Sequence, residues 1–167
     1  MKIIFKQRAI VVFIVLLISI GWVKTGNAQQ KFDKKVFYEV MDSGDLSAVN
    51  DQIEVVKASS LNNKDGYEGA LLMRKAGKVP LPKQKLKYFK EGRTKLETAI
   101  LADNDNTEFH FLRLAIEENA PKIVKYRADI EKDKLIIQKD FKNLSPTVQH
   151  AIIDYCKKSK VLHAEDF

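Results

Sequence analysis

From Gln29 onward, apolar residues recur at intervals of three and four, which places them on one face of an α-helix. Strict alternation of apolar and polar residues, the pattern of a half-buried β-strand, is nearly absent. Breaks rich in Gly, Pro, Asn and Asp separate the periodic stretches. Between these breaks we predict seven helices, at residues 32–42, 46–60, 65–77, 82–102, 106–119 and 121–143, and from Ser145 onward. The pattern therefore predicts an all-α fold.

Several residues have the side chains that typically begin or end helices. Asp65 and Glu68 have the spacing of a capping box, in which the first side chain accepts a hydrogen bond from a free N–H of the first turn. Pro82 suits the first turn of the fourth helix, because proline has no N–H to leave unpaired. Asn106 is a typical N-cap for the fifth helix, and Gly77 is a typical stop for the third.

The segment 121–143 is predicted to be one long C-terminal helix, followed by a short final one. Ile123, Ile130, Ile137 and Leu144 recur every seven residues along it. Such a stripe fits a helix that covers one end of the fold, and it also fits the seam of a dimer. We favour the covering helix, because stacked hairpins need an apolar lid.

Two stretches of the chain, residues 53–77 and 96–119, share the order helix, Asn/Asp-rich turn, helix. Their offset of about 43 residues suits a repeat of helical hairpins. The two stretches therefore suggest that one supersecondary unit occurs twice.

Gly92, Leu96, Ala99 and Asn104 are spaced as the small, bulky, small and turn positions in the second helix of a tetratricopeptide repeat. On these residues the region 45–119 resembles the tetratricopeptide (TPR) family. Asn104 stands where the family usually has Pro, and the Trp, Leu-Gly and Tyr positions of the family's first helix are not matched. The resemblance implies stacked antiparallel helical hairpins, with further helices after them, and a concave surface that binds peptides or protein segments.

The first 28 residues have the order of a secretory signal peptide. Met1–Arg8 carries three positive charges, Ala9–Val23 is apolar except for Ser19, and the small residues Gly26 and Ala28 follow. The apolar stretch would span about 22 Å as a helix, which is shorter than a hydrocarbon core of about 30 Å. We expect cleavage after Ala28. The alternative is an uncleaved membrane anchor.

The signal resembles those of Gram-negative bacteria, which places the mature protein in the periplasm or outside the cell. No cysteine lies near the cleavage site, so a lipid-anchored lipoprotein is excluded. Cys156 is the one cysteine in the sequence, so the chain forms no internal disulfide. We expect Cys156 to be a small apolar residue on a helix.

The formal net charge of the 167-residue chain is +7, but four of its 29 basic residues lie in the signal peptide. Residues 29–167 then hold 25 basic and 22 acidic residues, a net charge of +3. This balance, together with few aromatic residues among the lysines, argues against a nucleic-acid partner.

The remaining basic residues are unevenly distributed. Residues 74–95 hold nine of them against the single acid Glu91. On the predicted fourth helix, Lys83, Lys87 and Lys90 are spaced by four and three, so they form one positive strip. The strip suits an anionic partner, such as an acidic protein face, a phospholipid head group or a glycan. The alternative is a solvated face whose charge is offset by acids elsewhere, at residues 117–118 and 129–133.

No catalytic or metal-binding motif is present. The sequence has no glycine-rich phosphate loop, no Gly-x-Ser-x-Gly and no His-Glu-x-x-His. His110, His150 and His163 each lack a second ligand at helical spacing. The acids at residues 129–133 resemble part of a calcium loop, but Lys134 stands where that loop needs Gly. We therefore expect no metal site and no cofactor.

Three functions remain open. We favour an exported, non-enzymatic helical protein, residues 29–167 forming one domain, that binds a protein partner or helps to assemble a complex. The first alternative is an envelope protein that binds an anionic membrane surface through its basic helix. The second is a small helical enzyme, for which the candidate residues would be Glu117, Glu118, His110 and Tyr126.

Overall fold

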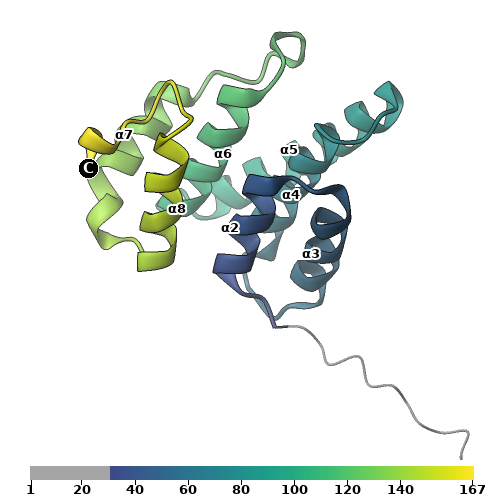
Figure 1. Ribbon diagram of the computed structural model, residues 1–167, viewed down its shortest axis with the longest axis horizontal. Coiled ribbons are helices and arrows are strands. Elements are labelled where there is room, and N and C mark those ends of the chain that lie inside the picture. Colours follow the sequence, from purple (N-terminus) through teal and green to yellow (C-terminus); the bar gives the residue numbers. More distant parts are fainter. Residues whose placement is uncertain (1–30) are drawn as a thin grey trace, which may run out of the picture. The chain divides into compact units, whose positions relative to one another are not determined.

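The structure is a computed structural model that describes residues 31–167. The predicted signal peptide and its cleavage at Ala28 lie outside the described residues. The described part contains no strand and has seven α-helices, which confirms the all-α prediction. The helices are α2 (Lys34–Ser43), α3 (Leu46–Ala58), α4 (Lys64–Ala76), α5 (Pro82–Ala102), α6 (Thr107–Asn119), α7 (Ile130–Asp140) and α8 (Pro146–Cys156), joined or followed by the short 3₁₀ turns η2 (Lys122–Val124), η3 (Phe141–Asn143) and η4 (Ala164–Asp166) (Figure 1).

Most helix ends follow the local signals in the sequence. Asn106 is the N-cap of α6, and its side chain accepts a hydrogen bond of 3.2 Å from the N–H of Phe109. Pro82 is the first residue of α5, as predicted. Gly77 ends α4 and directs its N–H back to carbonyls of the last turn.

The predicted capping box at Asp65 and Glu68 is wrong. Helix α4 begins at Lys64, with Asn63 as its N-cap, so Asp65 already lies inside the first turn. Both carboxylates instead face the Lys95 ammonium of α5, at 2.7 Å for Asp65 and 3.2 Å for Glu68. The two carboxylates therefore pair with Lys95 of the neighbouring helix instead of capping α4.

The long helix predicted over residues 121–143 is also wrong, because α7 begins only at Ile130. The chain first makes the turn η2 and then passes through Lys125 in the left-handed region, with φ of 49°. Ile123 is 88% exposed, whereas Ile137 is fully buried, so the seven-residue spacing does not form one continuous stripe. Neither a long covering helix nor a dimer seam along this segment remains.

Helices α4 and α5 form the closest pair in the fold, an antiparallel hairpin (Figure 1). Two glycines allow this close approach. A Cβ atom built on Gly92 would lie 2.5 Å from the carbonyl oxygen of Gly69, and one built on Gly69 would lie 2.7 Å from the carbonyl oxygen of Gly92. Backbone therefore packs against backbone at this crossing.

Helix α6 lies at the centre of the molecule and contacts two hydrophobic cores (Figure 1). Phe109 and Leu112 belong to a core with α2, α3, α4 and α5. Phe111 and Leu114 belong to a second core with α7 and α8. Every residue from Thr107 to Leu114 is buried, polar ones included. The polar side chains of α6 must therefore find partners inside the protein.

The Gly92 contact predicts an unusual response to alanine. Alanine normally stabilises a helix interior by roughly 1 kcal/mol relative to glycine, but here the added methyl group must push backbone apart. We expect G92A to lower the free energy of unfolding by about 1–3 kcal/mol in urea titrations. The control is G77A, because Gly77 has a helical φ and its new Cβ would meet nothing closer than 3.4 Å. Equal stability of the two variants would contradict the close-packing argument.

Candidate binding surface and the buried network behind it

Lys83, Lys87 and Lys90, the basic strip, lie on the N-terminal half of α5, and all three are exposed. None of the ion pairs within residues 31–167 involves them. Lys87 lies 5.9 Å from the ring centre of Tyr88, and Lys75 of α4 lies 4.3 Å from the same ring. The strip is therefore a set of solvated positive charges beside an aromatic ring.

The acids expected to offset this charge are engaged elsewhere. Glu118 accepts hydrogen bonds of 2.7 Å from the hydroxyls of Tyr155 and Ser159. Asp133 and Asp129 face the guanidinium of Arg113, at 2.7 and 3.6 Å. These three acids therefore make their contacts away from the strip, whereas Glu131 of the same set is exposed.

The connection between α6 and α7, residues 120–129, is fastened to α5 beside the strip. We call it the α6–α7 loop. The Tyr126 hydroxyl donates a 2.5 Å hydrogen bond to Glu97 of α5. Its ring meets the Phe89 ring nearly at right angles, with centres 5.7 Å apart, and lies 4.8 Å from the guanidinium carbon of Arg93. Burial, followed by the hydrogen bond to Glu97, raises the pKa of Tyr126 well above its ordinary value.

Three more contacts fasten the loop to the end of α6. The Arg127 side chain donates to the carbonyl of Glu117 at 3.1 Å and to the carbonyl of Glu118. These carbonyls belong to the last turn of α6, where the regular helical hydrogen bonds end; the carbonyl of Glu117 also accepts the N–H of Ala120 at 3.3 Å. The N–H of Asp129 donates to the Glu117 carboxylate at 3.1 Å. The C-terminal part of the loop, residues 126–129, is therefore fastened to α5 and α6, while Ile123 before it remains exposed.

A buried ion pair lies behind the loop. The Arg113 guanidinium donates two hydrogen bonds of 2.7 Å to Asp133 of α7 and one of 2.9 Å to Glu97 of α5. Asp133 is fully buried. Burial lowers the pKa of Arg113, but the hydrogen bonds and charge of Asp133 outweigh it, and the net shift is upward. This Arg113 network joins α5, α6 and α7.

His110 extends the network to the turn between α5 and α6. Its Nδ1 lies 2.7 Å from the Asp133 carboxylate, and its Nε2 donates to the carbonyl of Asn104 at 2.9 Å. The imidazole is fully buried, and both of its ring nitrogens lie within hydrogen-bonding distance of a protein group. Both ring nitrogens are used, and residues 31–167 contain no group of three or more His, Cys, Asp or Glu side chains placed to hold a metal ion.

The structure brings together three of the four residues named for the enzyme alternative. His110, Tyr126 and Glu117 all belong to the Arg113 network or touch it, whereas Glu118 faces Tyr155. Each of the three is buried and bonded to another protein group. The sequence analysis missed Arg113 as their centre. The spacing of residues 110, 113 and 117 on one side of α6 was the signal that could have found it.

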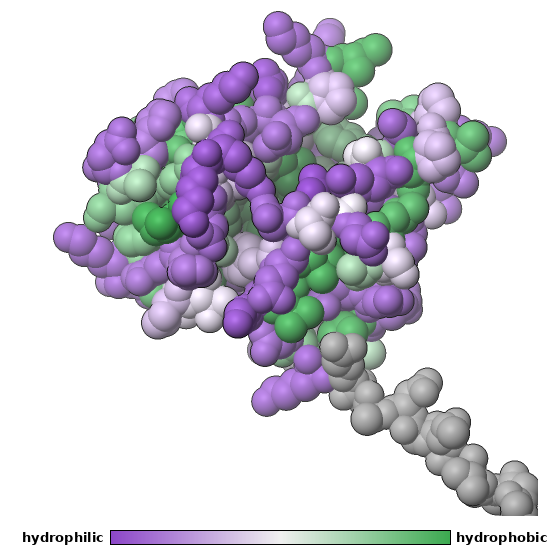
Figure 2. Space-filling model, viewed as in Figure 1, coloured by the Kyte–Doolittle hydropathy of each residue, from purple (hydrophilic) through white to green (hydrophobic). Residues whose placement is uncertain are grey.

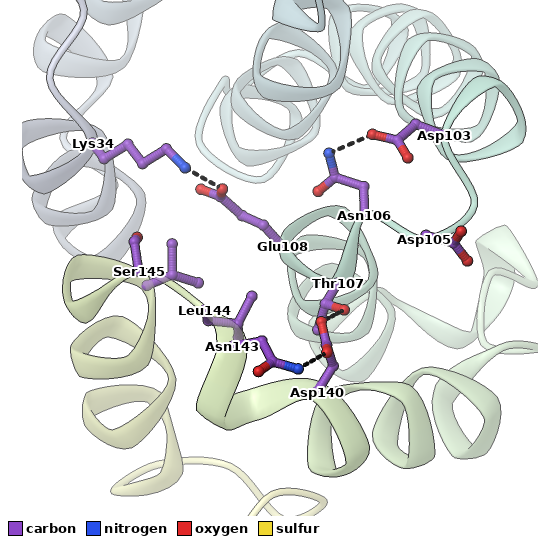
Figure 3. Close-up of a pocket in the computed structure, with 11 residues that line it drawn as sticks. Lys34, Asp103, Asp105, Asn106, Thr107, Glu108, Asp140, Asn143, Leu144 and Ser145 are labelled. Carbon is purple, nitrogen blue, oxygen red and sulfur yellow. Dashed lines mark hydrogen bonds and ion pairs between the residues drawn. The ribbon is translucent and has the colours of Figure 1, made fainter.

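A cavity of about 320 Å³ lies on another side of the molecule, between α2, the start of α6 and the end of α7 (Figure 3). Its polar lining is mostly bonded internally. Glu108 accepts from Lys34, Tyr38 and Tyr67. Asp140 accepts from Thr107 and Asn143, and these bonds lower its pKa. This cavity therefore offers few free groups to a ligand.

Comparison of the chain with family models, with curated proteins and with solved structures gave no match. Within residues 31–167, no helix has both the length and the apolar character needed to cross a membrane. The surface formed by α5 and the α6–α7 loop is the candidate functional surface of the described residues.

The buried ion pair predicts a strong and non-additive effect of substitution. R113M leaves the Asp133 carboxylate buried without its counter-charge, so we expect unfolding free energy to fall by about 3–5 kcal/mol. D133N removes that carboxylate. The double variant R113M/D133N should therefore lose clearly less than the sum of the two single losses in urea titrations. Additive losses would show that the two side chains do not act as a pair.

Glu117 predicts a pH dependence of stability. Burial, the largest cause, raises its pKa from 4.5 to about 6, although the N–H of Asp129 opposes the shift. A carboxyl with a raised folded-state pKa binds more protons folded than unfolded, so its contribution to stability falls as pH rises from about 4.5 to about 6. We expect the unfolding free energy of E117Q to lack this decrease with pH, because glutamine does not ionise. Urea titrations at several pH values across that range should show the unfolding free energies of the unchanged protein and E117Q diverging. Parallel curves would contradict the raised pKa of Glu117.

Proposed function

We propose that this protein is an exported, non-enzymatic helical interaction module that binds an anionic partner through the basic strip on α5. The observation that carries the proposal is the strip itself. Lys83, Lys87 and Lys90 are exposed on one helix, and no ion pair of residues 31–167 uses them. Solvated like charges on one helix face repel each other, so they do not stabilise the fold.

Two further features support a binding role. The α4–α5 hairpin that bears the strip projects from the body of the molecule, which gives a partner free access (Figure 1). The all-helical fold and its antiparallel α4–α5 hairpin support the scaffold of stacked hairpins that the resemblance to tetratricopeptide proteins implies. Export follows from the order of the first 28 residues, and it places the partner in the periplasm or outside the cell. No cofactor is part of this proposal.

The test is binding to the envelope of the source bacterium. Cells that synthesise the full chain with its own N-terminal segment are fractionated, and the bound share is measured by sedimentation. We expect about 0.5 M NaCl to release the protein, because salt screens exposed charges. The affinity of the triple variant K83E/K87E/K90E for the envelope fraction should be lower by roughly tenfold or more.

The matched control is K132E/K139E/K142E, which makes the same change of charge at exposed lysines on α7 and η3. This control should bind as the unchanged protein does. Equal loss in both triple variants would mean that net charge alone governs binding, and no loss in either would refute the basic strip as the binding face. Mild crosslinking in the same fractions would identify a protein partner, captured by the control and lost in K83E/K87E/K90E.

A further inference from the structure

Two exposed tips project on the same side of the protein. The first, the α4–α5 tip, comprises residues 77–90, the connection between the two helices and the first part of α5. The second is the α6–α7 loop. Figure 2 shows both projections, at the upper right and at the top, each with hydrophobic atoms set among hydrophilic ones and a hollow between them.

Both tips expose large aliphatic side chains. Leu81 and Leu86 of the α4–α5 tip are 56% and 51% exposed, and Ile123 of the α6–α7 loop is 88% exposed. Two other large apolar residues within 31–167 are as exposed, Leu101 and Leu135, and both lie outside the tips. Single exposed aliphatics are common on protein surfaces. Here three of them gather at two projecting points.

Basic residues surround these aliphatics. Residues 77–90 carry five lysines and no acid. The α6–α7 loop carries Lys122, Lys125 and Arg127 against the single acid Asp129, which faces the Arg113 guanidinium at the base of the loop. Lys122 directly precedes Ile123, and Lys125 follows two positions later. Each tip therefore combines aliphatic side chains with long, positively charged ones.

The distance between the tips is fixed by contacts at their base. The Tyr126 ring packs on Phe89 and Arg93 of α5, and its hydroxyl bonds to Glu97. Arg127 fastens the other side of the loop to α6. These contacts fix the conformation of the loop, although Ile123 itself is exposed and buries little surface against the protein. An exposed isoleucine on a fixed loop is suited to insert into an apolar environment outside the protein.

We infer that the two tips together form a docking surface for an anionic phospholipid bilayer. The inference rests on the proposed function and names the chemistry of its partner. A bilayer presents negative head groups above an apolar layer. Lysines reach the head groups while aliphatics at projecting points enter the boundary below.

The first measurement is sedimentation with vesicles, using the exported protein from cells that synthesise the full chain. Vesicles of equal parts phosphatidylglycerol and phosphatidylcholine should bind the protein, and vesicles of phosphatidylcholine alone should not. I123S keeps the charge and should weaken binding roughly tenfold, as expected for one aliphatic side chain withdrawn from an apolar layer. L101S is the matched control and should leave binding unchanged, because Leu101 is 82% exposed outside the tips.

The second measurement reports insertion directly. The one tryptophan of the sequence is Trp22, in the predicted signal peptide. I123W therefore adds a reporter at the loop apex, and L101W adds one at the control position. The unchanged protein supplies the background. With anionic vesicles the emission of I123W should shift to shorter wavelength, and that of L101W should not.

Every other outcome decides against a surface that places its aliphatic side chains in an anionic bilayer. Equal binding to neutral vesicles would assign the attachment to residues 1–30. Binding without a shift for I123W would mean that charge alone holds the protein at the surface. Absence of vesicle binding, with strip-dependent envelope binding intact, would leave the proposed function standing with a protein partner instead. Loss of both would refute the proposed function as well.

Discussion

The ion pair between Arg113 and Asp133 is the interaction on which the arrangement of the C-terminal half depends. Burying a guanidinium and a carboxylate is costly, and it is tolerated only where hydrogen bonds use most of their polar atoms. Asp133 receives two bonds from Arg113 and faces His110, while the remaining arm of Arg113 reaches Glu97. These directional bonds fix the relative positions of α5, α6 and α7 in a way that apolar packing alone does not.

The same network determines where the α6–α7 loop lies. Glu97 is held by Arg113 on one oxygen, so its other oxygen is held in place to accept the Tyr126 hydroxyl. Tyr126 then sets the loop against Phe89 and Arg93, one helical turn from Lys90. A chain of contacts therefore runs from the interior of the protein to the exposed surface. The geometry of that surface is a consequence of buried charge.

The sequence predicted the fold class and most helix boundaries, because those depend on local signals. The N-cap at Asn106, Pro82 at the start of α5 and the spacing of apolar residues each act within a few positions of the chain. The α6–α7 loop could not be predicted in this way. Its conformation depends on Tyr126 meeting Glu97, 29 positions away, and on Arg127 taking a carbonyl of α6. The seven-residue apolar spacing over the same segment predicted a helix. The contacts of Tyr126 and Arg127 hold residues 120–129 in a different conformation, and these distant partners cannot be identified from local spacing.

The candidate surface was partly predictable for a related physical reason. Exposed charge is visible in sequence as composition, so Lys83, Lys87 and Lys90 could be identified before the structure was known. Ile123 could not, because its spacing suggested burial. Inside the protein, Arg113 and Asp133 form an ion pair that joins three helices. The three lysines of the basic strip take part in no ion pair of residues 31–167, and Leu81, Leu86 and Ile123 are exposed. Local choices that oppose stability are expected at functional surfaces. That contrast, more than the net charge, distinguishes the tips from an ordinary solvated face.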